Sequence, residues 1–160
     1  MISNPGTVLS RVLETVTEPG PRIEKLRKVA AVLRETAGFG WVGLYDVDHA
    51  KGEVIDLVWA GPSAPAYPVF PTTKALTSGA IAEKRTIDVG DVHNEPRYLT
   101  ALGTTRSEII VPILSDQGEV VGTVDVESEQ PNAFDQKMEK LLEDCAVSLR
   151  PLFASRARLG

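Results

Sequence analysis

The spacing of hydrophobic residues changes twice along this chain, from a helical period to a period of two and back. Apolar residues follow a helical spacing up to residue 37, alternate in segments between 40 and 128, and regain the helical spacing after 132. This order is typical of an α+β fold, in which helices pack on one face of an antiparallel sheet. We therefore expect one domain over 1–160, with N-terminal helices at 6–37, a sheet with loops at 40–128 and a C-terminal helix at 132–157.

The predicted helices have recognisable ends. Pro21 suits the first position of the second helix, because its fixed φ angle is already helical. Asn132 is the predicted cap of the last helix, and Asp135 places a carboxylate where it favours the first turn. Residues that stop or kink the helices complete the pattern: Glu18-Pro19-Gly20, Gly38 and Pro151.

Two hairpins account for most of the predicted sheet. The first joins 41–47 to 53–60, and the second joins 108–114 to 119–127 around Asp116-Gln117-Gly118. Between them we expect the proline-rich stretch 61–68 to form an ordered loop or an edge. The remaining predicted elements are a helix at about 76–84, a strand at about 86–89 and a long loop at 90–106.

Charge and hydropathy exclude several classes of partner. The chain has 22 Asp and Glu residues against 17 Lys and Arg residues, a net charge of -5, whereas nucleic-acid-binding domains present basic surfaces. No apolar run approaches the roughly 20 residues of a membrane span. Residues 1–9 also lack the charged start and apolar run of a signal peptide. We therefore expect a cytoplasmic protein with neither a nucleic-acid nor a membrane partner.

Cys145 is the only cysteine. A single cysteine excludes an intrachain disulfide framework and a cysteine-rich zinc site. Because Cys145 belongs to the apolar stripe of the last helix, we expect it to be a buried packing residue. We assign no metal and no cofactor.

The segment Thr123-Val124-Asp125-Val126-Glu127 separates apolar from acidic side chains. Since side chains alternate along a strand, Val124 and Val126 should face the helices together with Val42 and Leu44. By elimination, the opposite face collects the acidic and aromatic side chains of the candidate site, joined by one at the start of the neighbouring strand: Trp41, Tyr45, Asp125, Glu127 and Glu108.

Carboxylates gathered in one place repel one another, so they either share protons or bind a cation. An ammonium group on a small ligand is the natural complement, and Trp41, Tyr45 or Tyr67 could add a cation–π attraction of about 0.5–2 kcal/mol. The loops at 61–71 and 90–106 would enclose this pocket if they fold over the face. The alternative is that the acidic residues lie on a solvated sheet face and bind nothing.

Other chemical side chains have equally ordinary interpretations. His93 could act as a general base or haem ligand, although a lone histidine in a polar loop more often has a structural hydrogen-bonding role. Arg97 and Arg106 could bind a ligand carboxylate through their guanidinium groups, or pair with Asp91 or Glu108.

Four segments together resemble a GAF domain, and within that superfamily the branch of free methionine-R-sulfoxide reductases. The resemblance covers nearly the whole chain from about Pro21, and it implies a central antiparallel sheet with long helices on one face and ligand-enclosing loops on the other. The segments are Trp41-Val42-Gly43-Leu44-Tyr45, Asp88-Val89-Gly90-Asp91-Val92-His93, Arg106-Ser107-Glu108-Ile109-Ile110-Val111-Pro112-Ile113 and Gly122-Thr123-Val124-Asp125-Val126-Glu127-Ser128.

The resemblance also implies roles for single residues. It places the ammonium group of a free amino acid against Glu108, Asp125 and Glu127, and it assigns an aromatic wall to Trp41 and Tyr45. Glu127 stands at a position that is more often Asp in that branch.

The redox residues of the branch are not retained. Its sulfoxide reduction needs an attacking thiolate and a resolving thiol. The positions that match the family's cysteines hold Tyr67, Thr77 and Ala101, so we assign no catalytic residue.

The leading hypothesis is a stand-alone, non-catalytic GAF domain with a sensory role. It would bind a small amine-bearing, amino-acid-like ligand in a pocket lined by acidic and aromatic side chains: Trp41, Tyr45, Tyr67, Glu108, Asp125 and Glu127. Two alternatives stay open. One is an enzyme like the free methionine-R-sulfoxide reductases with divergent or lost chemistry, and the other is an interaction module whose helices form a homodimer.

Overall fold

The structure is a computed structural model that describes residues 4–98 and 102–154. In these residues it contains one antiparallel sheet of six strands. The strands lie side by side in the order β3-β2-β1-β6-β5-β4, so the two long hairpins meet at the centre of the sheet. In chain order they are β1 (Trp41–Asp48), β2 (Glu53–Ala60), β3 (Val69–Pro71), β4 (Ile87–Val89), β5 (Ser107–Leu114) and β6 (Val120–Ser128).

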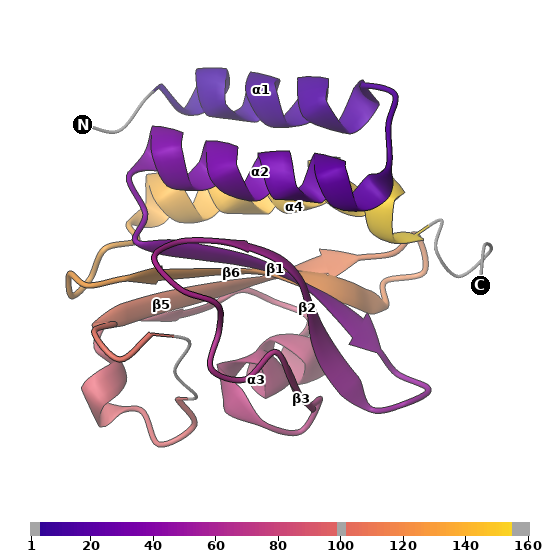
Figure 1. Ribbon diagram of the computed structural model, residues 1–160. Coiled ribbons are helices and arrows are strands. Elements are labelled where there is room, and N and C mark those ends of the chain that lie inside the picture. The colour runs from indigo at the N-terminus through magenta and orange to yellow at the C-terminus, as the bar shows by residue number, and fades with distance from the viewer. Residues whose placement is uncertain (1–3, 99–101, 155–160) are drawn as a thin grey trace.

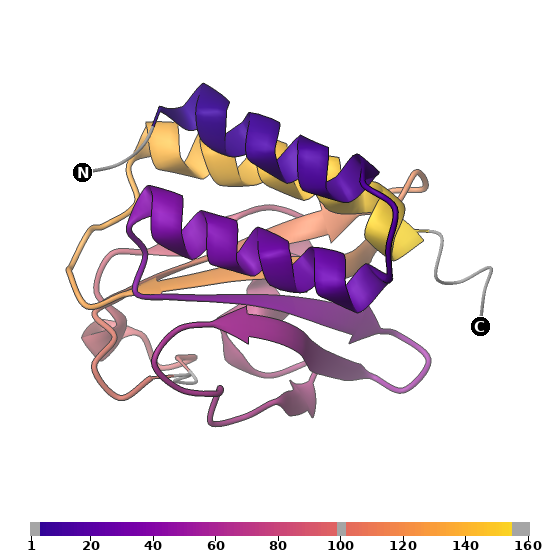
Figure 2. The same cartoon turned by 45° about the horizontal axis from the view of Figure 1, so that its top comes forward.

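The long helices all lie on one side of this sheet, as the sequence predicted (Figure 1). The helices α2 (Arg22–Ala37) and α4 (Gln136–Ala154) pack against the strands, and α1 (Pro5–Thr17) covers both helices from outside (Figure 2). On the other side lie α3 (Ala75–Glu83) and the 3-10 helix η1 (Val92–Asn94). The arrangement confirms the α+β class and the GAF-like fold.

Local capping explains where the first two helices begin and end. Asn4 accepts a hydrogen bond from the Gly6 amide at 2.8 Å, which satisfies one of the free N–H groups at the start of α1. Pro21 is the capping residue of α2 and not its first helical residue, because its backbone is extended. Gly38 ends α2 as predicted, in the left-handed conformation that glycine adopts without steric cost.

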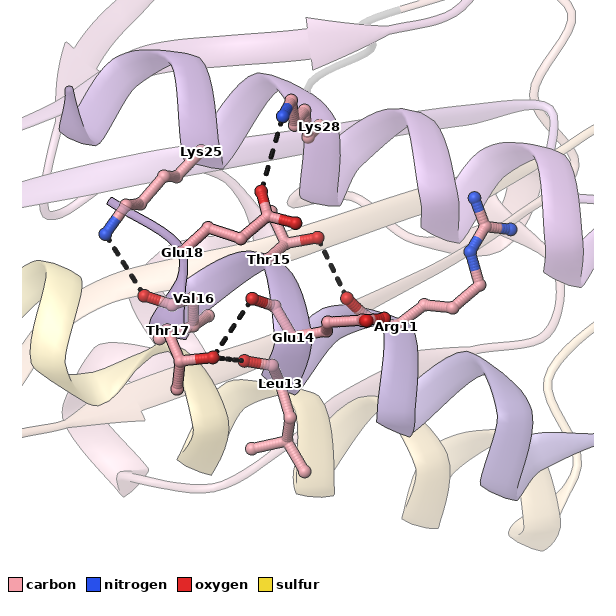
Figure 3. A network of polar contacts seen from close by, with 9 residues as sticks. All are labelled: Arg11, Leu13, Glu14, Thr15, Val16, Thr17, Glu18, Lys25 and Lys28. Carbon is pink, nitrogen blue, oxygen red and sulfur yellow. Dashed lines mark hydrogen bonds and ion pairs between the residues drawn. The ribbon is translucent and has the colours of Figure 1, made fainter. Parts of the chain in front are cut away.

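Polar contacts fix the corner between α1 and α2 (Figure 3). Lys25 of α2 donates a hydrogen bond to the Val16 carbonyl at 3.2 Å, satisfying an acceptor in the last turn of α1. Lys28 pairs with Glu18 at 3.4 Å, directly after α1 ends. The two helices are therefore held at the corner by contacts that supplement their apolar packing.

The start of α4 differs from the prediction. Asn132 is not its cap: its φ angle is 53°, and its amide donates to the Gly90 carbonyl at 2.9 Å. Asp135 caps the helix instead, accepting from the Met138 amide at 2.9 Å. Pro151 does not end the helix, which continues to Ala154. The predicted end of this helix, at 157, lies outside the described residues.

The segments between the hairpins are close to expectation. The predicted helix at about 76–84 is α3, and the predicted strand at about 86–89 is β4, one residue shorter. The proline-rich stretch leads into β3, which forms one edge of the sheet. The predicted long loop at 90–106 contains η1 near its start.

The main core lies between the helices and the sheet. Val42, Leu44, Val124 and Val126 are fully buried in it, which confirms the predicted apolar face. Cys145 is also fully buried there, and burial, followed by the nearby charge of Asp144, raises the pKa of its thiol to about 12. Within the described part of the chain, no helix has the length and apolar character needed to cross a membrane.

Candidate functional site

The face of the sheet away from the long helices carries the acidic and aromatic side chains. Strand β1 pairs with β6 so that Trp41 lies opposite Glu127, Gly43 opposite Asp125 and Tyr45 opposite Thr123. Directly opposite residues of an antiparallel pair project to the same face. On the next strand, Glu108 of β5 lies opposite Glu127, so the pairing of three neighbouring strands brings the acids together.

The three carboxyl groups of Glu108, Asp125 and Glu127 form one cluster. Each contributes an oxygen atom that lies within 4.8 Å of the other two. Their exposed fractions are 2%, 7% and 1% respectively, so the cluster is buried and does not lie on a solvated sheet face. Three such oxygens can accept hydrogen bonds from an ammonium group or coordinate a divalent cation.

Side chains of the loop that precedes β5 hold Glu127 in position by hydrogen bonds. The Tyr98 hydroxyl donates to Glu127 Oε1 at 3.0 Å, and the Thr105 hydroxyl donates to the same oxygen at 2.6 Å. Both donors are neutral, so they orient Glu127 without balancing a negative charge. The loop at 90–106 therefore contacts the acidic face, as the sequence predicted.

Buried polar atoms of Asp125 and Thr123 lack hydrogen-bond partners among the described residues. They are Oδ1 of Asp125 and Oγ1 of Thr123, which stand two residues apart on β6 and project to the same face. Thr123 is completely buried. A buried polar group without a partner costs about 1–3 kcal/mol, so these two atoms mark a place where a ligand group would be stabilised.

Burial and mutual repulsion shift the proton affinity of the cluster. Burial raises the pKa of Asp125 to about 8, and the negative charges of Glu127 and Asp56 add to the rise. The pKa of Glu108 is raised well above its ordinary value, mainly by burial and then by the charges of Asp125 and Glu127. Near neutral pH the site therefore holds protons that a bound cation can replace.

An aromatic wall stands beside the acids. The rings of Trp41 and Tyr45 lie 6.4 Å apart between centroids, and Phe70 of β3 meets Tyr45 edge to face at 5.9 Å. The Trp41 indole donates to the Ser63 carbonyl at 3.1 Å, which ties the loop at 61–68 to the wall. Burial raises the pKa of the Tyr45 hydroxyl, and the charge of Asp125 adds to this, so the hydroxyl stays protonated.

Two glycines make room for the Trp41 ring. A Cβ atom added at Gly43 would lie 2.4 Å from the Trp41 ring and 2.7 Å from the Tyr45 ring. A Cβ atom added at Gly61 would lie 2.4 Å from Trp41, at the opposite end of the indole. Real Cβ atoms essentially never come this close, so both positions are restricted to glycine unless the tryptophan moves.

Asp56 brings a fourth carboxyl group to this face. It lies opposite Tyr45 where β2 pairs with β1, after an irregularity that shifts the register between Leu44 and Tyr45. Its amide donates to the Pro68 carbonyl at 2.7 Å. Burial raises the pKa of Asp56 to about 7.

Tyr67 lies apart from the acidic cluster. Its side chain is 49% exposed and lines a hollow of about 610 Å³. Phe70 and Tyr98 also line this hollow, and these two contact Tyr45 and Glu127 respectively. The structure thus places Tyr67 in a hollow that adjoins the acidic site through Phe70 and Tyr98.

The remaining candidate side chains make ion pairs or lie exposed. Arg106 lies 3.5 Å from Asp91, so it forms the ion pair that was one of its two predicted roles. Arg97 pairs instead with Glu95 at 2.7 Å. His93 is exposed, and its ring lies 3.8 Å from the Asp91 carboxylate, a position that suits a structural contact.

Four residues that contribute to the site were not predicted to do so: Asp56, Tyr98, Thr105 and Thr123. Thr123 was placed on the correct face by alternation, but the pattern gave no sign that its hydroxyl lacks a partner. Tyr98 and Thr105 belong to a loop without any period. Asp56 was hidden by the irregularity in the first hairpin, which breaks the alternation from which its facing could be derived.

Comparison with known proteins agrees with the fold. Residues 21–149 match the family model of the GAF domain. The chain is 30% identical over 135 residues to GAF domain-containing protein A of Dictyostelium discoideum, covering 84% of this chain and 83% of that protein. It is also 30% identical over 106 residues to free methionine-R-sulfoxide reductase of Saccharomyces cerevisiae, covering 66% of this chain and 58% of that protein.

Solved structures extend the relationship. The free methionine-R-sulfoxide reductase of Neisseria meningitidis in complex with its substrate is 32% identical, with a TM-score of 0.87, covering 99% of this chain and 97% of that one.

The cysteine positions separate this chain from those enzymes. The only cysteine is Cys145, buried in the main core. Of the three positions that correspond to the branch's cysteines, Tyr67 lines the hollow, Thr77 is buried on α3, and Ala101 lies outside the described residues. The chain therefore belongs to the GAF domain family, as a close relative of the free methionine-R-sulfoxide reductases that lacks their catalytic cysteines.

Proposed function

We propose that this protein binds a small, amino-acid-like ligand through its ammonium group and does not reduce it. Glu108, Asp125 and Glu127 would accept hydrogen bonds from the ammonium group, while Trp41 and Tyr45 would form the wall of the pocket. The role would be sensory, with ligand occupancy as the signal.

One observation carries this proposal: three carboxyl groups meet within 4.8 Å in a buried place. Burying carboxylates together is costly unless a cation or shared protons offset their charge. In the described part of the chain, no Lys, Arg or His forms an ion pair with Glu108 or Asp125. A cationic ligand group would supply the missing charge and a partner for Asp125 Oδ1.

The aromatic wall supports an organic cation over a bare metal ion. The faces of tryptophan and tyrosine rings attract ammonium groups by about 0.5–2 kcal/mol, and they also bury apolar parts of a ligand. The related reductase whose structure contains its substrate indicates that this fold accommodates a small ligand. We carry over the ligand class to this chain and not the reaction.

Thermal denaturation in the presence of single compounds tests the proposal. L-methionine should raise the melting temperature by a few degrees at saturating concentration, because a ligand that binds only the folded state stabilises it. Its deaminated analogue 4-(methylsulfanyl)butanoate should have no effect, since it lacks the ammonium group. If a panel of free amino acids and simple amines produced no stabilisation at all, the proposal would be wrong.

Two variants locate the binding. Asp125→Asn and Glu108→Gln keep the size of each side chain while removing its negative charge, and each should reduce or abolish the ligand-induced stabilisation. Asp88→Asn is the matched control, because Asp88 lies near Glu139 of α4 and away from the cluster. Unchanged stabilisation in both site variants would refute the acidic pocket.

The relationship to free methionine-R-sulfoxide reductases supports a second candidate function, a reductase with altered chemistry. Free L-methionine-R-sulfoxide should not be consumed with dithiothreitol or thioredoxin as reductant, because the chain has no second thiol and Cys145 is buried with a raised pKa. Robust turnover that disappears in Cys145→Ser would overturn the non-catalytic assignment.

A further inference from the structure

Asp56 is the acidic residue of this face that the ammonium-binding cluster leaves unexplained. It comes from β2, on the other side of β1 from the cluster, and lies directly opposite Tyr45. Its side chain shares the face of Tyr45, because directly opposite residues project to the same side of the sheet. Its negative charge acts on both Tyr45 and Asp125, which places it within electrostatic reach of the cluster.

One oxygen atom of the Asp56 carboxyl group also lacks a partner. Its Oδ1 atom is buried and has no hydrogen-bond partner among residues 4–98 and 102–154, and no Lys, Arg or His in these ranges forms an ion pair with it. Burial raises the pKa of Asp56 to about 7, as expected for a carboxyl group without a compensating charge.

An independent feature points to a ligand between Asp56 and Asp125. Thr123 is completely buried, and its hydroxyl has no hydrogen-bond partner in the part of the chain that the structure describes. It lies opposite Tyr45 on β6, just as Asp56 lies opposite Tyr45 on β2. Three unsatisfied polar atoms thus lie on this face: Asp56 Oδ1 on β2, and Thr123 Oγ1 and Asp125 Oδ1 on β6.

One ammonium group cannot contact all the carboxyl groups on this face. Counting Asp56, four carboxyl groups lie on the face, and burial raises the pKa values of Asp56, Asp125 and Glu108. Strands β2 and β6 are two strand spacings apart, roughly 10 Å. A single ammonium group held by the cluster at Asp125 would leave Asp56 unpaired at the other side of the pocket.

We propose that Asp56 binds a second cationic group, so that the pocket takes a diamino acid or a diamine in preference to a monoamine. One ammonium group lies in the cluster of Glu108, Asp125 and Glu127, and the other contacts Asp56 across the face of Tyr45. A chain of about four or five atoms between the two nitrogens spans the distance once a hydrogen bond of about 2.9 Å is added at each end. This inference rests on the proposed function and narrows its ligand class.

Isothermal titration with L-ornithine and L-norvaline at pH 7.5 tests the inference. The two amino acids share the same carbon skeleton and differ by the terminal ammonium group of ornithine. L-ornithine should bind about tenfold or more tightly than L-norvaline, because it adds a charge-assisted hydrogen bond to Asp56. Asp56→Asn should bring this ratio close to one, and Asp88→Asn, away from the site, should keep it.

Three results would overturn the inference: equal affinities in the wild-type protein, a ratio preserved in Asp56→Asn, or binding of neither amino acid. Asp125-dependent binding of L-norvaline with no preference for L-ornithine would leave the proposed function standing and remove only the second cationic group. If neither amino acid binds, a titration with L-methionine under the same conditions decides whether the proposed function fails as well.

Discussion

Replacing Asp125 with asparagine should make the ligand-free protein more stable at alkaline pH. Burial raises the pKa of Asp125 from 3.8 to about 8, helped by the charges of Glu127 and Asp56. Between these pH values the folded protein holds a proton that the unfolded chain has lost. The free energy of unfolding therefore falls as the pH rises from about 4 to about 8, and the full loss is present above pH 8.

The size of this loss of stability follows from the pKa shift of Asp125. Raising one pKa from 3.8 to about 8 corresponds to about 6 kcal/mol of lost stability above pH 8, because each pKa unit is worth about 1.4 kcal/mol. This figure is a ceiling, since water that enters the pocket when Asp125 ionises lowers the cost. We expect Asp125→Asn to gain at least about 2 kcal/mol at pH 9 and almost nothing at pH 4.

Urea denaturation followed by tryptophan fluorescence at several pH values between 4 and 9 measures this effect. The wild-type protein should lose stability across the range, and the Asp125→Asn variant should lose distinctly less. Asp116→Asn serves as control, because it removes a carboxylate that is 84% exposed and leaves the cluster intact. The reasoning is refuted if the variant and the wild type lose the same stability, or if the variant is the less stable protein at pH 9.

Three further substitutions test separate parts of the structure. Gly43→Ala should cost about 1–3 kcal/mol and change the near-ultraviolet circular dichroism of the aromatic wall, whereas Gly103→Ala, which meets no atom within 4 Å, should do neither. Cys145→Ser should destabilise the core by about 1–3 kcal/mol, because it buries a hydroxyl group among apolar side chains. The wild-type thiol should react with Ellman's reagent only after unfolding, and fast reaction of the folded protein would contradict the burial of Cys145. Tyr98→Phe should cost about 1 kcal/mol and weaken ligand binding by removing a donor to Glu127; unchanged affinity in a titration would argue against that role.

The sheet and its two faces could be predicted because alternation fixes them locally. Once Val124 and Val126 are assigned to the helices, Asp125 and Glu127 must face the other way, and the register observed between β1 and β6 agrees. The burial of Cys145 followed in the same way from the helical stripe. These features depend on periods that are visible in a few consecutive residues.

Features that depend on contacts between distant segments could not be predicted. Asn132 and Asp135 are about equally good caps, and the choice between them depends on the hydrogen bond from the Asn132 amide to Gly90. Tyr67 was proposed for the pocket because its aromatic ring could attract a cation, and a proline-rich loop has no period that fixes the direction of its side chain. Asp56 was missed for a similar reason, because the irregularity in the first hairpin changes the face of the sheet to which its side chain projects.

The sheet ends in very short strands on both sides, and this limits how the protein can associate with itself. The edge strands β3 and β4 each have three residues, and the part of β5 beyond β4 contains Pro112, which has no N–H group to offer. The short edge strands and Pro112 therefore offer few backbone groups for pairing with a strand of another molecule. These short edges thereby protect from edge-to-edge aggregation a fold that buries several carboxyl groups against its sheet.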